Sequence, residues 1–460
     1  MSGPHSLSRS RLAGRALHPA GPLAVQVFAQ GVNFLTQIAL LAVFGAEFYA
    51  PVGLVLVAAA TLCFIGELGY PVVFLGAVTR DDDWPRHWRI ALFHRMMVLG
   101  GGTACALGLW AWIYGIGGEG WGALAAAAPG IIASAWQPAP LLYGQGRAQA
   151  AALSVYGRWG VYGLGMALVL ILGVPSGWVI GLVFSVGMIT PLLFWPWLGL
   201  SAALLRPRAN RRLGRLGRGA LAWWMMALLG TLNDRGLPFL IEATRPAILA
   251  HALLALQVLQ GLAALAGQFD RLLVPWLVGR LKAPGWARDL ALVQGGVLSV
   301  ALGVAALLVG VLALGLPLAE RGALSWLLAE WALVLCGGAF TAAILARGQE
   351  RPFARMLTIL LICGCLSQAG VALAGGPFVA VMIVRLVVAG LCLAVALRLL
   401  GLSAPREAWF LAAGGGACVA LANATPAAAP LIGLGLGLAG LGLWRGWNAY
   451  CQIDRGESRR

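Results

Sequence analysis

The stretch VQVFAQGVNFLTQIALL, from Val25 to Leu41, decides the fold. It lies inside an apolar run of about 20 residues, which is long enough to cross a bilayer as a helix. Four uncharged polar side chains interrupt it: Gln26, Gln30, Asn33 and Gln37. At about 100° per residue, these four amides fall within an arc of roughly 60° on a helix. The stretch therefore predicts a membrane-spanning helix with one polar edge.

The composition of the whole chain is that of a membrane protein. Of its 460 residues, 60% are hydrophobic and only 10% are charged, whereas a soluble domain carries about 25% charged residues. Apolar runs of about 20 residues recur along the chain, and an outer-membrane barrel would show ten-residue alternation instead. The sequence predicts an all-α polytopic membrane protein.

We expect about 14 transmembrane helices, because about 14 apolar runs are long enough to span the hydrocarbon core. The predicted spans are 21–44, 50–75, 91–115, 121–143, 153–173, 177–200, 219–242, 246–275, 289–316, 325–346, 354–374, 377–400, 408–424 and 427–444.

The arginines predict the orientation. The net charge is +16, and the basic residues gather at the N-terminus, in alternate loops and in the C-terminal tail. The opposite loops contain only Arg245 and Arg321. By the positive-inside rule, both termini lie in the cytoplasm, and we expect a multi-pass protein of the bacterial inner membrane. Since the basic composition follows from this topology, membrane lipids are expected partners and nucleic acid is not.

A basic segment divides the chain into two halves. Residues 201–218 are rich in arginine, and six predicted spans precede them. We expect an N-terminal six-helix lobe (1–200), this basic cytoplasmic linker on anionic lipid headgroups, a C-terminal six-helix lobe (219–400), and two additional helices with a cytoplasmic tail (401–460). Two six-helix halves suggest a transporter whose substrate path runs between the lobes.

The second half has polar positions of its own. On the eighth predicted span, a second set of polar side chains shares an arc of roughly 80°: Gln257, Gln260, Gln268 and Arg271. The seventh span places Asn233, Asp234 and Arg235 near the middle of an apolar stretch, where charges are costly unless they pair or face water. A functional role would explain this adjacent pair, and so would mutual neutralisation or pairing with another helix for structural reasons. Glu67 and Arg385 are weaker candidates, because either side chain can reach a membrane interface.

The two polar edges predict a common aqueous cavity between the lobes. Amides bind sugar hydroxyls without adding charge, and arginine binds phosphate through two parallel hydrogen bonds. Hydrogen bonding between helices of the first lobe is the alternative explanation for the first edge. We assign ion coupling to Asp234 and Glu67, and predict no catalytic residue, metal or cofactor. The predicted substrate-binding residues are Gln26, Gln30, Asn33, Gln37, Arg235, Gln257, Gln260, Gln268 and Arg271.

Four stretches resemble a known family. They are NFLTQIALLAVFGAEFYA (33–50), FIGELGYPVVFLGAVTRDDD (64–83), LLYGQGRAQAAALSVYGRWGVYGLGMALVL (141–170) and AILARGQERPFARMLTILLICGCLSQAGVALAGGP (343–377). With them, the chain resembles the polysaccharide and O-antigen flippases of the multidrug/oligosaccharidyl-lipid/polysaccharide exporter superfamily.

This resemblance implies two six-helix bundles arranged as a V, followed by two C-terminal helices. It also implies alternating access and outward transport of an undecaprenyl-pyrophosphate-linked oligosaccharide across the inner membrane. A proton or a sodium ion is the implied coupling ion, and proteins of polysaccharide assembly, for lipopolysaccharide O-antigen or exopolysaccharide, are the implied partners.

Two other functional classes remain as alternatives. A cation-coupled multidrug antiporter of the same fold would have acidic and aromatic cavity residues, where this chain has amides and arginines. A polytopic glycosyltransferase or polymerase would need a large extracytoplasmic loop, and the predicted loops on that side are short. We therefore expect a flippase and not an enzyme.

Overall fold

The structure is a computed structural model that describes residues 20–70, 74, 83–210, 215–262, 286, 303–317, 320, 323–347 and 349–401. No strand occurs within these ranges, so the prediction of an all-helical fold is confirmed. Among the described residues, five helices are long and apolar enough to span a membrane: Val27–Glu67, Trp84–Tyr114, Gln149–Leu172, Pro352–Leu373 and Phe378–Leu400. The last two predicted spans and the end of the eighth lie outside the described residues.

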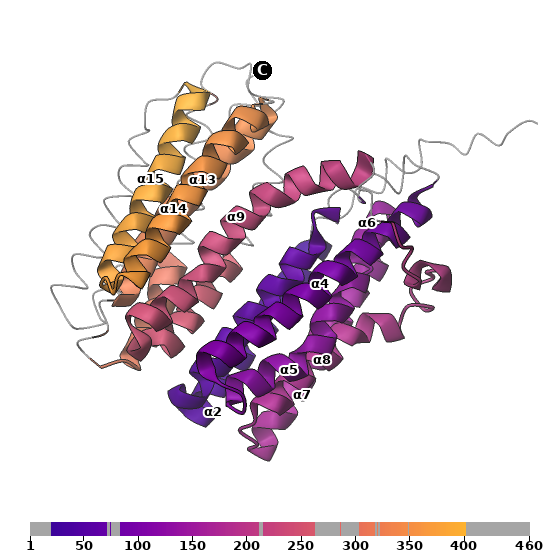
Figure 1. Ribbon diagram of the computed structural model, residues 1–460, viewed down its shortest axis with the longest axis horizontal. Coiled ribbons are helices and arrows are strands. Elements are labelled where there is room, and N and C mark those ends of the chain that lie inside the picture. The colour runs from indigo at the N-terminus through magenta and orange to yellow at the C-terminus, as the bar shows by residue number, and fades with distance from the viewer. Residues whose placement is uncertain are drawn as a thin grey trace, which may run out of the picture.

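The helices before residue 200 form one group, which we call the N-terminal helices (Figure 1). They are α2 (Ala20–Glu67), α4 (Trp84–Tyr114), α5 (Glu119–Ala133), α6 (Ala139–Gly144), α7 (Ala148–Leu172) and α8 (Gly177–Leu193), with the short 3-10 turns η1 (Ser134–Trp136) and η2 (Ala202–Leu205). Helix α5 packs along α8, and α2 packs against α5 and α7.

Helix α2 contains two membrane-length helices joined at Gly45. Gly45 has φ of +82°, a conformation that side chains other than glycine rarely adopt. The Tyr49 hydroxyl donates to Gln37 Oε1 at 2.6 Å, although twelve residues of straight helix would separate them by about 18 Å. The chain therefore reverses its direction at Gly45.

The second group, which we call the C-terminal helices, begins with α9 (Arg215–Thr244). It continues through η3 (Pro246–Ile248), the helices Pro246–Leu262 and Gly303–Leu314, α13 (Ala323–Ala346), α14 (Glu350–Leu373) and α15 (Phe378–Leu400). Figure 1 shows α13, α14 and α15 side by side, with α9 between them and the N-terminal helices. Helix α9 contacts both α14 and α2.

The first part of the linker lies on the N-terminal helices. The indole N–H groups of Trp88, Trp136 and Trp195 donate to its main-chain carbonyls at 3.0–3.1 Å. The Nε2 atom of His94 lies 2.6 Å from the carbonyl oxygen of Asn210. These contacts fix residues 201–210 across one end of the helices. We call that end the linker end, and the opposite one the Gly45 end.

The two groups share one core toward the Gly45 end and have separate cores at the linker end. The shared core combines α2 and α7 with residues from every C-terminal helix except α14, for example Tyr49, Met166, Ile241, Leu253, Val309, Leu327 and Met382. Toward the linker end, one cluster around Trp88 and Trp195 belongs to the N-terminal helices, whereas another around Phe340 and Leu397 belongs to the C-terminal helices. The described helices are thus closed together toward the Gly45 end.

Candidate substrate-binding site

The amides of α2 form a hydrogen-bonded chain that reaches the C-terminal helices. Asn33 Nδ2 donates to Gln257 Oε1 at 2.8 Å, and Gln37 Nε2 donates to Asn33 Oδ1 at 3.0 Å. Tyr49 completes the chain at Gln37, whose side chain is buried at 1% exposure. In this conformation, these predicted cavity residues bond to one another across the contact between the two groups.

The other predicted amides lie near this contact or outside the described part. Gln30 lies beside Gly261: a Cβ atom added to Gly261 would be 3.8 Å from the Cβ of Gln30. Gln260 lines a small cavity of about 70 Å³ together with Asp234 and Arg385. The side chain of Gln26 and all of Gln268 and Arg271 lie outside the described residues.

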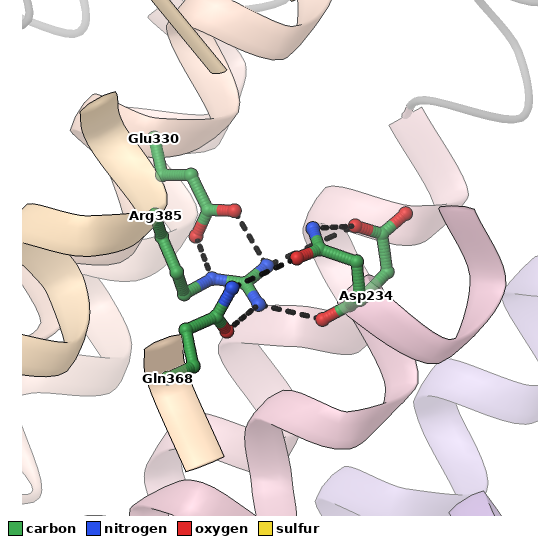
Figure 2. A network of polar contacts seen from close by, with 5 residues as sticks. Asp234, Glu330, Gln368 and Arg385 are labelled. Carbon is green, nitrogen blue, oxygen red and sulfur yellow. Dashed lines mark hydrogen bonds and ion pairs between the residues drawn. The ribbon is translucent and has the colours of Figure 1, made fainter. Parts of the chain in front are cut away.

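Arg385 is the centre of a buried polar network (Figure 2). Its Nε donates to Glu330 Oε2 at 2.7 Å, and its Nη2 lies 2.5 Å from Glu330 Oε1. Its Nη1 donates to the carbonyl oxygen of Asn233 at 2.5 Å and to Gln368 Oε1 at 3.0 Å. Only 3% of Arg385 is exposed. Arg385, a weaker candidate in the sequence, thus has its partners within the protein, on α9, α13 and α14.

Asp234 lies at the edge of this network. One carboxylate oxygen is 3.8 Å from Arg385 Nη2 and accepts from Asn233 Nδ2 at 3.3 Å. Its side chain is 56% exposed, whereas that of Glu330 is only 8% exposed. Glu330 therefore neutralises Arg385 directly, and the Asp234 carboxylate remains accessible.

A cavity of about 270 Å³ extends from this network between α9, α13, α14 and α15. Asn233, Asp234, Glu330 and Arg385 line its polar part. The rest of its wall is mainly apolar, with side chains such as Val334, Phe353, Leu357, Leu361, Val388 and Leu393. The cavity is amphipathic, and Asp234 is its exposed carboxylate.

Arg235 follows Asp234 on α9 and interacts electrostatically both with Asp234 and with the N-terminal helices. Glu67, the last residue of α2, interacts electrostatically with Arg95, Arg158 and Arg235. We call these four residues the arginine group. The sequence did not suggest that Asp234 and Arg235 act on two different sides of α9, although adjacent helical residues point about 100° apart.

Hydrogen bonds to the main chain hold the arginine group together. Arg95 Nε donates to the carbonyl of Gly66 at 3.2 Å, next to Glu67, and its Nη2 donates to Ser134 at 3.0 Å. The indole of Trp224 donates to the carbonyl of Ile65 at 3.0 Å, which fixes α9 beside the same end of α2. Arg95 is 2% exposed.

Each arginine of this group has a buried nitrogen without a hydrogen-bond partner among the described residues: Arg95 Nη1, Arg158 Nε and Arg235 Nη1. A buried donor without an acceptor costs about 1–3 kcal/mol, and more when it carries charge. The three arginines also outnumber the two carboxylates that interact with them electrostatically, Glu67 and Asp234. This arrangement can bind an anion that has several acceptor oxygens.

The group lies deep in the helices. Arg95 is eleven residues into α4 and Arg158 is ten residues into α7, so both lie about 15–17 Å from the starts of these helices. Sequence reasoning missed both residues, although each is an arginine within an apolar run, which is the signal that identified Arg235.

Known proteins share the fold of this chain. A scan against protein-family models and a search of the curated proteins found no match. A MOP superfamily transporter from Pyrococcus furiosus is 16% identical, with 82% of this chain and 94% of that chain covered and a TM-score of 0.53. An outward-facing multidrug resistance MATE family transporter of the same superfamily is 14% identical, with coverages of 84% and 96% and a TM-score of 0.50. A MATE protein in complex with MaL6 is also 14% identical, with coverages of 82% and 94% and a TM-score of 0.50.

These likenesses establish the fold. The described chain has the same helical fold as these transporters. Its long apolar helices indicate a multi-pass membrane protein.

Proposed function

We propose that this protein is a transporter that moves a lipid-linked oligosaccharide, joined to undecaprenyl through pyrophosphate, outward across the bacterial inner membrane. The supporting observation is the arginine group, which offers three buried guanidinium N–H donors that have no hydrogen-bond partner in the described part of the chain. Pyrophosphate oxygens accept such charge-assisted hydrogen bonds, and guanidinium matches their geometry better than ammonium does. The anion would thereby be stabilised at a depth where a bare charge is costly.

Alternating access gives the amide chain a role in this proposal. In the present conformation, Asn33 and Gln257 bond to each other between the two groups. When the groups separate at the Gly45 end, both amides lose this partner and become available to sugar hydroxyls. The amides would then bind the glycan after the phosphates have left the arginine group.

We further propose that Asp234 binds the coupling ion, a proton or a sodium ion. Its carboxylate is half exposed and lines both cavities beside Arg385. A cation at Asp234 would weaken its pair with Arg385, and thereby the contact between α9 and α15. Proteins of polysaccharide assembly would supply the loaded lipid and receive it after transport.

Substitution of the arginine group tests the proposal. In a strain that lacks the native protein, Arg95→Gln, Arg158→Gln and Arg235→Gln should each reduce surface glycan at least tenfold per folded protein. Each variant removes a charged hydrogen bond to the pyrophosphate, which contributes about 1.5–3 kcal/mol. Arg235→Lys should restore only part of the export. The exposed linker residue Arg208 provides the control, because Arg208→Gln should export normally. Full export by all three variants would contradict the proposal.

Export of hydrophobic cations is a second candidate function. The amphipathic cavity beside Asp234 favours it, since an exposed carboxylate at an apolar wall attracts a lipophilic cation. The same strain distinguishes the two functions: Asp234→Asn would lower resistance to toxic cations if the protein is a drug exporter, while the arginine variants would leave that resistance unchanged.

A further inference from the structure

We infer that Asn33 and Gln257, which we call the amide pair, recognise a 2-acetamido sugar whose amide group takes the place of the bond between them. In the present conformation, Asn33 Nδ2 donates to Gln257 Oε1 at 2.8 Å, from one group of helices to the other. The inference rests on the proposed function and names its substrate class: a lipid-linked oligosaccharide whose sugar next to the pyrophosphate carries an acetamido group.

The hydrogen bonds that lead to the amide pair all run in one direction. The Tyr49 hydroxyl donates to Gln37 Oε1 at 2.6 Å, and Gln37 Nε2 donates to Asn33 Oδ1 at 3.0 Å. Tyr49 is 0% exposed and Gln37 is 1% exposed, so water does not compete for these bonds. Because Gln37 already donates to the oxygen of Asn33, the part of Asn33 that faces Gln257 is its NH2 group, which can only donate.

Gln257 has the opposite character, since it presents a carbonyl oxygen that accepts from Asn33. A group that replaces this bond on both sides must accept from Asn33 and donate to Gln257. An acetamido group has a carbonyl acceptor and an N–H donor on opposite sides of one plane, so it pairs with these amides as they pair with each other. A hydroxyl offers both functions through a single atom and spans a narrower gap. An acetyl ester accepts but cannot donate, and would leave the oxygen of Gln257 without a donor.

The amide pair lies near the arginine group, on the side toward the Gly45 end. Phe28 contacts Tyr156, and Val32 lies against Gly163, where a Cβ atom would be 2.8 Å from Val32 Cγ1. Helix α7 therefore runs parallel to the first pass of α2. Gly163 follows Arg158 by five residues, which is about 7.5 Å along the helix axis. Val32 immediately precedes the first member of the amide pair, so the sugar joined to the pyrophosphate is the part of the substrate that this pair can reach.

The test compares three short glycolipids that differ at one position of the sugar. Each is farnesyl pyrophosphate joined to glucose, with an acetamido group, an O-acetyl ester or a hydroxyl at carbon 2. The acetamide and the ester have the same size and the same carbonyl, but the ester has no N–H donor for Gln257. We expect purified wild-type protein to bind the acetamide about tenfold more tightly than the ester, because the ester leaves a polar atom of the site unpaired. The hydroxyl ligand should also bind more weakly than the acetamide.

Two variants on different helices assign the preference to the amide pair. Gln257→Met removes the acceptor and should abolish the preference for the acetamide over the ester. Asn33→Leu removes the donor and should weaken binding of both acetylated ligands by a similar factor. As a control, Gln149→Met replaces an exposed glutamine of α7 and should keep the wild-type preference. Arg235→Gln should weaken all three ligands equally, because the pyrophosphate is common to them.

Either variant decides the test if the other does not fold. Equal binding of acetamide and ester by wild-type protein would overturn the inference and leave the proposed function intact. An undiminished preference for the acetamide in Gln257→Met, or unchanged affinities in Asn33→Leu, would overturn it in the same way. Failure of wild-type protein to bind any of the three glycolipids would instead contradict the proposed function.

Discussion

Arg385 shows how a single residue joins four helices. It lies on α15 and bonds to Asn233 on α9, Glu330 on α13 and Gln368 on α14. A buried charge keeps its low energy only while its partners remain, because an unpaired ion in an apolar interior is costly. The network therefore stabilises one arrangement of the C-terminal helices.

Replacing Arg385 alone should destabilise the protein more than replacing both Arg385 and its partner Glu330. Arg385→Met leaves Glu330 buried without a cation, and should lower the free energy of unfolding by about 3–5 kcal/mol. The double variant Arg385→Met/Glu330→Leu should recover most of this loss. Asp234→Asn should cost about 0–1 kcal/mol, because its side chain is half exposed and its ion pair is long. Denaturant titration in mixed micelles measures these differences, and a double variant as unstable as the single one would contradict this view of the pair.

At the scale of the element, Gly45 decides where α2 ends its first pass. Gly31 and Gly45 provide a matched pair, because an added Cβ has no atom within 4 Å at either position, but only Gly45 has positive φ. Gly45→Ala should cost about 1–3 kcal/mol in backbone strain. Gly31→Ala should gain up to about 1 kcal/mol through helix propensity. Equal effects in thermal unfolding would show that the turn does not require glycine.

The helices and their polar edges follow from local sequence, and the sites between helices do not. The spacing of Asn33 and Gln37 predicts that both lie on one helical face, and both belong to one hydrogen-bonded chain. Asn33 bonds to Gln257 because two helices that are far apart in the sequence pack against each other. No local sequence pattern determines that packing.

The partners of the charged residues do not follow from local sequence either. Asp234 and Arg235 were predicted as candidates from their depth in an apolar run. Besides their interaction with each other, Asp234 pairs with Arg385 and Arg235 interacts with Glu67, which are 151 and 168 positions away in the chain. Arg95 could have been found by the same depth argument, whereas the assembly of the group required the fold.

At the scale of the whole molecule, the distribution of arginines predicts that both ends of the chain and the linker lie in the cytoplasm. Reporter fusions after Arg212 and after Arg455 should report the cytoplasm, because arginines gather at these positions. A fusion near Gly322 should report the opposite side. An extracytoplasmic signal at Arg212 would refute the division into six plus six spans.

In the proposed alternating-access cycle, the shared core at the Gly45 end makes this conformation the state that is closed at that end. The contact between Gln30 and Gly261 provides a way to lock that state. The Cβ separation there would be 3.8 Å, which is the mean value for a disulfide. A disulfide between Gln30→Cys and Gly261→Cys should therefore form in a cysteine-free background without distorting either helix.

Flipping of a lipid-linked oligosaccharide by this double variant in reconstituted vesicles tests the central claim most directly. The reduced protein should move the glycolipid between leaflets, although more slowly than a cysteine-free protein that retains Gln30 and Gly261, because Gln30 is one of the predicted substrate-binding amides. The oxidised protein should stop, and reductant should restore flipping. Equal rates of flipping by oxidised and reduced protein would contradict an alternating-access flippase. The absence of flipping by the cysteine-free protein that retains Gln30 and Gly261 would also contradict it.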